Sequence, residues 1–183
     1  MNYTIEEFCD AHHACKGGRD WALANCETMQ EAWGKAESKN VVWIALQKGV
    51  LTDKELRLFA VFCARQNQHL LTDQRSIDAI DVAERYANGN ATDDELHSAL
   101  AAAAAAARAA AYAAYAAYSA DAAYAAARVA DAAYAASYCA ASYFARAARA
   151  ALAAADAAYS ADAARAAQSD YLKSNTKPNF TKP

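Results

Sequence analysis

The pattern of apolar and polar positions changes near the middle of this chain of 183 residues. Over the first 98 residues, apolar side chains recur every three or four positions between polar ones, which is the spacing of one face of an α-helix. From 99 to 167, alanine supplies 43 of 69 residues, in a stretch without glycine or proline. The two parts therefore predict helices of different kinds.

Helix starts in the first part are marked by threonine followed three positions later by glutamate. Thr4–Glu7, Thr28–Glu31, Thr52–Glu55 and Thr92–Glu95 have this arrangement, in which the two side chains satisfy unpaired backbone N–H groups. Thr72 lacks the glutamate but precedes another apolar pattern. These starts predict short helices joined by tight turns.

Glycine marks the expected helix ends. Gly17–Gly18 is expected to end the first helix, Gly49 to follow the fourth, and Asn88–Gly89 to end the helix that begins near Asp73. Glycine favours such positions because it adopts the left-handed backbone conformation without a steric penalty.

Two helices between 53 and 87 are expected to pack against each other. Each has apolar residues at helical spacing: Leu56, Phe59, Cys63 and Leu70, with Phe62 beside them, in the first, and Ile77, Ile80, Ala83 and Ala87 in the second.

The short apolar run from 41 to 46 admits two interpretations. Its β-branched residues fit a buried strand, and its length does not distinguish a strand from a helix. No partner strand is visible elsewhere in the sequence, so the run is predicted to be a helix that follows Asn40.

The alanine-rich region favours helix by intrinsic propensity but has little apolar surface to bury. A single helix from Asp93 to Ser169 would be about 115 Å long, far beyond the usual length in a globular protein. We therefore expect several helices packed closely along alanine seams, with Ser119 and Ser160 as the best candidates for new helix starts. Whether the region is one helix or several stays open at this point.

These patterns predict an all-α fold, in which a bundle of short helices continues into long alanine-rich helices packed as a bundle or an elongated array. The helical head is expected over 1–92, the alanine- and tyrosine-rich region over 93–171, and an irregular tail over 172–183. The head and the alanine-rich region are expected to be continuous as one fold.

Charge and composition exclude some classes of function. The formal net charge is −3, and residues 1–98 hold 16 Asp and Glu against 10 Lys and Arg. Without a basic stripe, nucleic-acid binding is not expected. Charged residues interrupt the alanine run, the start lacks a signal peptide, and the five cysteines are an odd number, so we expect a cytoplasmic protein with free thiols and no membrane contact.

One cluster in the head could carry chemistry. Cys9 and His13 stand four positions apart and could share a metal, with Cys26 or His69 completing the site, or the same residues could form a thiol nucleophile with its base. Paired C-x-x-C spacing is absent, and buried cysteine commonly packs as a small hydrophobe. No catalytic residue, metal or cofactor is therefore predicted.

Tyrosines are the preferred candidates for a binding surface. They either fill the seams between helices or form an aromatic surface for a protein partner or a second copy of the chain. The candidate partner-binding residues are Tyr112, Tyr115, Tyr118, Tyr124, Tyr134 and Tyr138.

Several short motifs occur in a distinctive order. They are Cys15–Trp21 (CKGGRDW), Glu31–Trp33, Asn40–Trp43, Cys63–Arg65 and Ala83–Gly89, followed by the alanine and tyrosine tract. In this order the chain resembles the immunity-protein-five-like family of bacteria and phages, whose members have a helical head followed by an alanine-rich half. The resemblance implies a non-enzymatic protein that protects a cell by binding a toxin or effector.

Three hypotheses for the function follow. The chain could be a binding module that occludes a protein target, as an immunity or phage counter-defence protein. It could be a self-assembling alanine-rich structural or accessory protein of a phage. It could also be a small metal- or thiol-dependent enzyme that uses the cysteine and histidine cluster. The first hypothesis is preferred, with a protein partner, self-association, or both.

Overall fold

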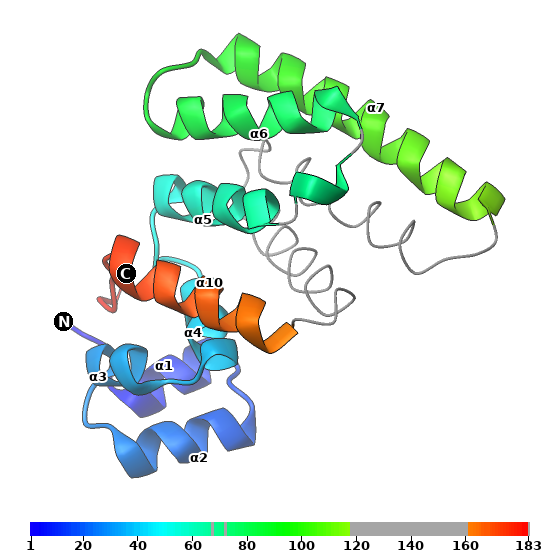
Figure 1. Cartoon of the computed structure of the whole chain (residues 1–183). Helices are drawn as coiled ribbons and strands as arrows, with labels where there is room; N and C mark the ends of the chain where they lie inside the picture. The colour runs from blue at the N-terminus through cyan, green and yellow to red at the C-terminus, as the bar shows by residue number, and fades with distance from the viewer. Residues whose placement is uncertain (67, 72, 118–160, 183) are drawn as a thin grey trace. The chain divides into compact units, whose positions relative to one another are not determined.

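The computed structural model describes residues 1–66, 68–71, 73–117 and 161–182. Within these ranges all regular elements are helices, which confirms the predicted all-α fold (Figure 1). In chain order they are α1 (Ile5–Ala11), α2 (Lys16–Asn25), α3 (Met29–Lys35), α4 (Ser38–Ala45), α5 (Asp53–Gln66), the 3₁₀ helix η1 (Gln68–Leu70), α6 (Gln74–Ala87), α7 (Asp93–Ala117) and α10 (Ala161–Asn175).

The chain divides into two compact units. The first combines Met1–Thr52 with Ala166–Pro183, and the second comprises Asp53–Arg165. The division expected at 92 coincides with neither boundary. Tertiary contacts between the two ends of the chain decide the grouping, and composition alone does not reveal them.

Helices α1 to α4 all contribute to the core of the first unit. Phe8 from α1, Ala22 from α2 and Trp33 from α3 are buried together with half of the residues of α4. In α4, Val41 and Val42 are almost fully buried, and the helix covers the apolar run through Ala45 as predicted. A helix can bury this run without a partner strand because neighbouring helices cover it on more than one side.

The C-terminal segment is an integral part of the same core. Leu172 in α10 is fully buried, and the ring of Phe180 packs edge-on against Phe8 with ring centroids 5.7 Å apart. The backbone N–H of Asn179 donates to the carbonyl of Val50 at 2.7 Å. Helix α10 continues to Asn175, so the irregular tail begins after 175 and not at 172 as expected, and it is docked at several points.

Several predicted helix starts are present. Thr4 with Glu7 and Thr92 with Glu95 form complete capping boxes. Thr28 accepts a hydrogen bond from the Glu31 N–H, whereas the Glu31 carboxylate accepts the N–H of Glu27, outside the expected box.

Further helix starts follow the sequence pattern less closely. Helix α5 begins directly after Thr52. Helix α6 begins after Asp73, whose carboxylate accepts the Arg75 N–H at 3.0 Å.

The prediction that Gly17–Gly18 ends the first helix is wrong. Helix α1 ends at Ala11 with His12 as its C-cap, and His13 takes the left-handed conformation with φ 54°. Both glycines lie inside α2, where glycine is tolerated at a cost of about 1 kcal/mol relative to alanine.

Gly89 ends α6 as predicted. Its φ is +77°, and its N–H donates to the carbonyl of Tyr86. The N–H of Asn90 donates to the carbonyl of Arg85. These two hydrogen bonds form a Schellman motif. Gly49, with φ +85°, lies in the turn that follows α4.

In the second unit, α5 packs against α6, as predicted. A buried cluster joins α5, α6 and the start of α7: Ala60, Val61, Ala64, Ile80, Ala83 and Leu96. The predicted α6 residues Ile80 and Ala83 are in it. On α5 the cluster is centred about 150° around the helix from Phe59, which is also buried, so α5 has a wider apolar face than its spacing indicated.

Two arginines fasten this unit at its surface. Arg65 of α5 donates to the carboxylates of Glu84 and Asp81 on α6. Arg85 of α6 donates to Glu95 of α7 at 3.1 Å. An arginine that holds two carboxylates in a network stabilises helix packing more than an isolated surface pair does.

The described part of the alanine-rich region contains buried alanines. Ala103, Ala106 and Ala107 of α7 are buried, and α7 runs antiparallel beside α6 (Figure 1). Close packing along alanine is therefore present as far as the structure describes. The expected helix starts at Ser119 and Ser160 lie outside the described residues.

The two glycine assignments give opposite expectations for alanine substitutions. Gly17→Ala should stabilise the protein by about 0.5–1 kcal/mol, because the position is helical and nothing lies within 4 Å of an added Cβ. Gly89→Ala should destabilise it by about 1 kcal/mol or more, because φ is positive there. Urea denaturation measures both. Destabilisation by Gly17→Ala would instead indicate that this glycine ends a helix, as predicted from the sequence.

Glu7 should make stability depend on pH. Its pKa is lowered to about 2, because its carboxylate accepts hydrogen bonds from Lys182 Nζ at 2.7 Å and from the Thr4 N–H. A lowered folded-state pKa gives stability that is present above the unfolded value near 4.3 and is lost as the pH falls towards 2. Gln retains the capping box, so the advantage in Tm of the wild type over Glu7→Gln should be constant above about pH 6 and shrink below pH 4.

Thermal denaturation between pH 7 and pH 2 tests this dependence. The matched control is Glu27→Gln, which removes an exposed carboxylate without an ion pair in the described structure. A Tm difference for Glu7→Gln that stays the same down to pH 2 would contradict the role given to the Lys182 contact.

Candidate functional site

The predicted tyrosine surface falls largely outside the described residues. Tyr118, Tyr124, Tyr134 and Tyr138 lie in the range 118–160. Tyr112 and Tyr115 lie three residues apart on α7, of which only the backbone is described at these positions. The tyrosine surface therefore stays a prediction. The candidate site described below lies in the first unit.

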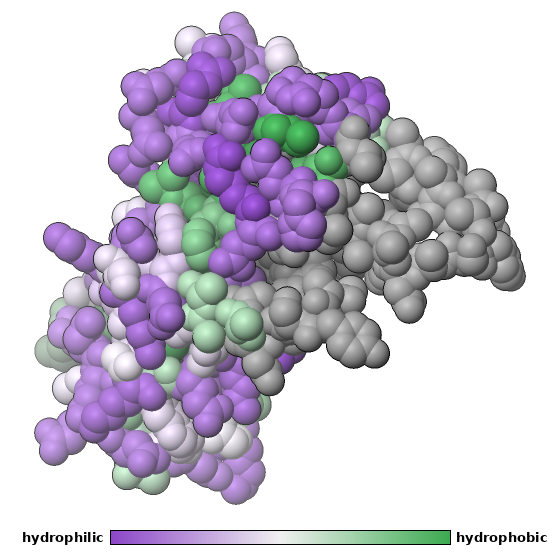
Figure 2. All heavy atoms as spheres, in the orientation of Figure 1, coloured by the Kyte–Doolittle hydropathy of each residue, from purple (hydrophilic) through white to green (hydrophobic). Residues whose placement is uncertain are grey.

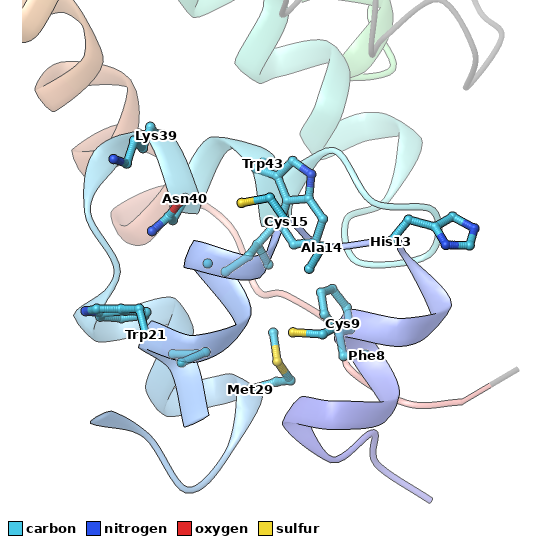
Figure 3. A pocket seen from close by; sticks show the side chains of 14 residues that line it. Phe8, Cys9, His13, Ala14, Cys15, Trp21, Met29, Lys39, Asn40 and Trp43 are labelled. Atoms are coloured by element: carbon cyan, nitrogen blue, oxygen red, sulfur yellow. The ribbon is translucent and has the colours of Figure 1, made fainter. Parts of the chain in front are cut away.

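A cavity of about 350 Å³ opens among helices α1 to α4 of the first unit. Figure 3 shows Trp21 of α2 and Trp43 of α4 on different sides of it. Its lining consists of Phe8, Cys9, His13, Ala14, Cys15, Gly18, Trp21, Ala22, Met29, Ala32, Lys39, Asn40, Trp43 and Ile44. We call it the tryptophan cavity.

Three sequence motifs that are separate along the chain meet at this cavity. The first contributes Cys15, Gly18 and Trp21, the second contributes Ala32, and the third contributes the two ends of Asn40–Trp43. These are three of the five motifs on which the family resemblance rests. Each motif is visible in the sequence, but only the packing of α2, α3 and α4 brings them to one place.

The cavity is apolar inside and polar at its edge. Phe8, Met29 and Ile44 are buried around it, whereas both tryptophans are half-buried. At the edge, the side chain of Lys39 is 72% exposed and lies 3.6 Å from Glu37. Such an exposed pair contributes little, so the ammonium group is available to another anion.

The α1–α2 pair that borders the cavity is fastened by Arg19. Its guanidinium contacts Asp10 and lies 3.7 Å from Glu6, both on α1. These contacts raise the pKa of Arg19, chiefly through the hydrogen bond to Asp10. They connect α2, which has Cys15 as its N-cap and Trp21 in its second turn, to α1.

The structure does not support the pairing of Cys9 with His13 that the sequence left possible. Helix α1 ends before His13, so the two residues do not share a helical face, and the His13 imidazole points away from the other labelled side chains (Figure 3). Among the described residues there is no group of three or more His, Cys, Asp or Glu side chains that could hold a metal ion.

Three of the four cysteines that the structure describes are in environments that disfavour the nucleophilic thiolate. Burial raises the pKa values of Cys9, Cys26 and Cys63, because an apolar surrounding disfavours the thiolate. Cys15, by contrast, is exposed as the N-cap of α2 and borders the tryptophan cavity.

A second cavity, of about 340 Å³, lies where the two ends of the chain meet. Residues from three segments line it: Tyr3, Phe8, Ala11, His12, Lys48, Gly49, Val50, Asn179, Thr181 and Lys182. We call it the terminal cavity. No sequence motif indicated it, because the C-terminal segment that completes it is more than a hundred residues away from the other two segments.

The surface around these helices is largely hydrophilic. Figure 2 shows polar side chains over most of the face of α1, α2 and α3 that it presents. None of the helices that the structure describes has the length and hydropathy to cross a bilayer.

Comparisons with protein-family models, with curated proteins and with solved structures found no match for this chain.

Thiol labelling of the native protein should follow exposure. Among the cysteines that the structure describes, Cys15 should react first with iodoacetamide at pH 8, and Cys9 and Cys63 should lag by at least about tenfold, because they are buried and protonated. Peptide mass spectrometry over a time course measures each cysteine separately, with the protein in urea as the control in which the differences vanish. Labelling of Cys9 as fast as Cys15 would instead indicate an activated thiol in the cavity.

Proposed function

We propose that this chain is a non-enzymatic protein-binding module of the immunity or phage counter-defence kind, which inactivates a protein target by occluding part of its surface. One observation carries the proposal: three of the five motifs that resemble the immunity family converge on the tryptophan cavity. A cavity assembled from three such motifs is the best candidate for the site that makes the first contact with a target.

The chemistry of the cavity suits a side chain of a protein partner. Half-buried tryptophans above an apolar floor form the kind of pocket that receives one apolar side chain at the centre of an interface. Met29 and Cys9 at the floor are soft and adaptable to the shape of the occupant. The polar edge allows the surrounding contact to remain hydrated.

The charge at the edge specifies the occupant further. Lys39 is the cationic side chain that lines the cavity, and its pairing with Glu37 is weak. We therefore assign the cavity to a leucine- or phenylalanine-sized side chain of the target, next to an Asp or Glu that pairs with Lys39. Complementary charge of this kind sets orientation and association rate more than affinity.

Two variants at the cavity test the proposal against two matched controls. Cys15→Phe fills the opening at an exposed position, and Lys39→Glu reverses the charge at the edge. Ala24→Phe adds the same side chain at an exposed position of α2 away from the cavity, and Lys54→Glu reverses an exposed charge on α5. All four positions are exposed, so the variants should fold.

Cross-linking in host cells followed by mass spectrometry supplies candidate targets, and each candidate is then purified and titrated calorimetrically. We expect a 1:1 complex that Cys15→Phe and Lys39→Glu weaken at least about tenfold, which corresponds to about 1.4 kcal/mol, while both controls bind like the wild type. The activity of the target should be lost at saturation.

Three results would contradict the proposal. The target could bind with its activity unchanged, which would rule out inactivation by occlusion. Cys15→Phe and Lys39→Glu could both bind the target like the wild type, which would rule out the tryptophan cavity as the binding site. Light scattering could instead show a dimer of this chain that Cys15→Phe disrupts, which would assign the cavity to self-assembly.

A further inference from the structure

We propose that the terminal cavity binds a small organic acid, with its carboxylate on the side of Lys48 and Asn179 and a flat apolar body against Phe8 and Tyr3. This site is separate from the tryptophan cavity and does not depend on the function proposed for it. Its volume of about 340 Å³ lies at the lower end of the range for small-molecule sites, which suits a ligand with a single ring.

The side chains that carry a full charge and line the terminal cavity, as the structure describes it, are both lysines. Lys48 and Lys182 both line it, and no Asp or Glu is among its lining residues in the described structure. Lys182 forms an ion pair with Glu7, whose carboxylate accepts a hydrogen bond from one of its three N–H groups. Lys48 has no ion pair within the part of the chain that the structure describes. A cation without a partner beside a cavity attracts an anionic ligand.

Uncharged donors are also available at the terminal cavity. The side-chain oxygen of Asn179 accepts from both the N–H and the hydroxyl of Thr181, so its amide NH₂ remains as a donor. The Tyr3 hydroxyl makes no hydrogen bond to another described residue. Together with Lys48, these groups supply more donors than acceptors, which favours a carboxylate over a neutral ligand.

Apolar and aromatic residues also line the terminal cavity. Phe8, Ala11 and Val50 line it, and the ring of Tyr3 meets that of Phe8 edge-on at 5.8 Å. His12 lies close to Phe8, with ring centroids 4.4 Å apart, and burial lowers its pKa, so its imidazole is uncharged at neutral pH. An inorganic anion would leave this surface without contacts, whereas an aromatic or compact aliphatic acid would cover it.

Occupation of this cavity should also affect the ends of the chain. Its lining comes from the N-terminal segment, from the turn at Gly49 and from the docked C-terminal segment. The two ends are paired through Asn2 and Thr181 and through the N–H of Lys182, which donates to the carbonyl of Met1 at 3.0 Å. A ligand that contacts all three segments would favour the docked arrangement of the tail.

Calorimetry and NMR with benzoate test the inference on the full chain. Benzyl alcohol has the same ring without the charge, and inorganic phosphate has charge without the ring. We expect saturable 1:1 binding of benzoate, with benzyl alcohol and phosphate weaker by at least about tenfold. The backbone amide signals of Gly49 and Thr181 should move on titration, and that of Gly18 at the tryptophan cavity should not.

Lys48→Gln should weaken benzoate binding about tenfold without changing Tm in the absence of ligand, since the side chain is exposed and has no ion pair in the described structure. Lys54→Gln is the matched control and should bind like the wild type. The inference is overturned if benzoate does not saturate, if phosphate binds as tightly as benzoate, if Lys48→Gln binds unchanged, or if Gly18 shifts in place of Gly49.

Discussion

The first unit depends on the return of the C-terminal segment to the N-terminal helices. Helices α1 to α4 have seven to ten residues each, and helices of this length are not stable alone in water. They persist because Leu172 and Phe180 complete their core, and because Asn179 and Lys182 bond to Val50 and Glu7. Both ends of the chain are therefore needed to form one folded unit.

Phe8 connects this core with both candidate sites. Its side chain is 1% exposed and lines the tryptophan cavity and the terminal cavity alike. Around it are the rings of Trp43, His12 and Phe180, which differ in polarity and in position along the chain. One buried ring thus separates an apolar cavity that suits a partner's side chain from a cation-lined cavity that suits a small acid.

The second unit is stabilised differently. Alanine buries little surface, so α6 and α7 gain from close approach of their backbones and from the few larger residues at the seam, such as Ile80 and Leu96. Arginine contacts at the surface add to this, with Arg65 fastening α5 to α6 and Arg85 fastening α6 to α7. The position of Arg57, buried with its guanidinium 4.6 Å from the ring of Tyr86, adds a second arginine contact between α5 and α6.

The sequence by itself determined the all-α class, the capped starts at Thr4 and Thr92 and the end at Gly89, because these features depend on residues within one helical turn of each other. It misplaced the end of α1, because glycine is compatible with a helix interior as well as with a helix end. It named some residues of the tryptophan cavity, such as Cys15, Trp21 and Trp43, without showing that they meet, and it gave no sign of the terminal cavity. Only the tertiary structure decided these, since contacts between segments far apart in sequence depend on how whole helices pack.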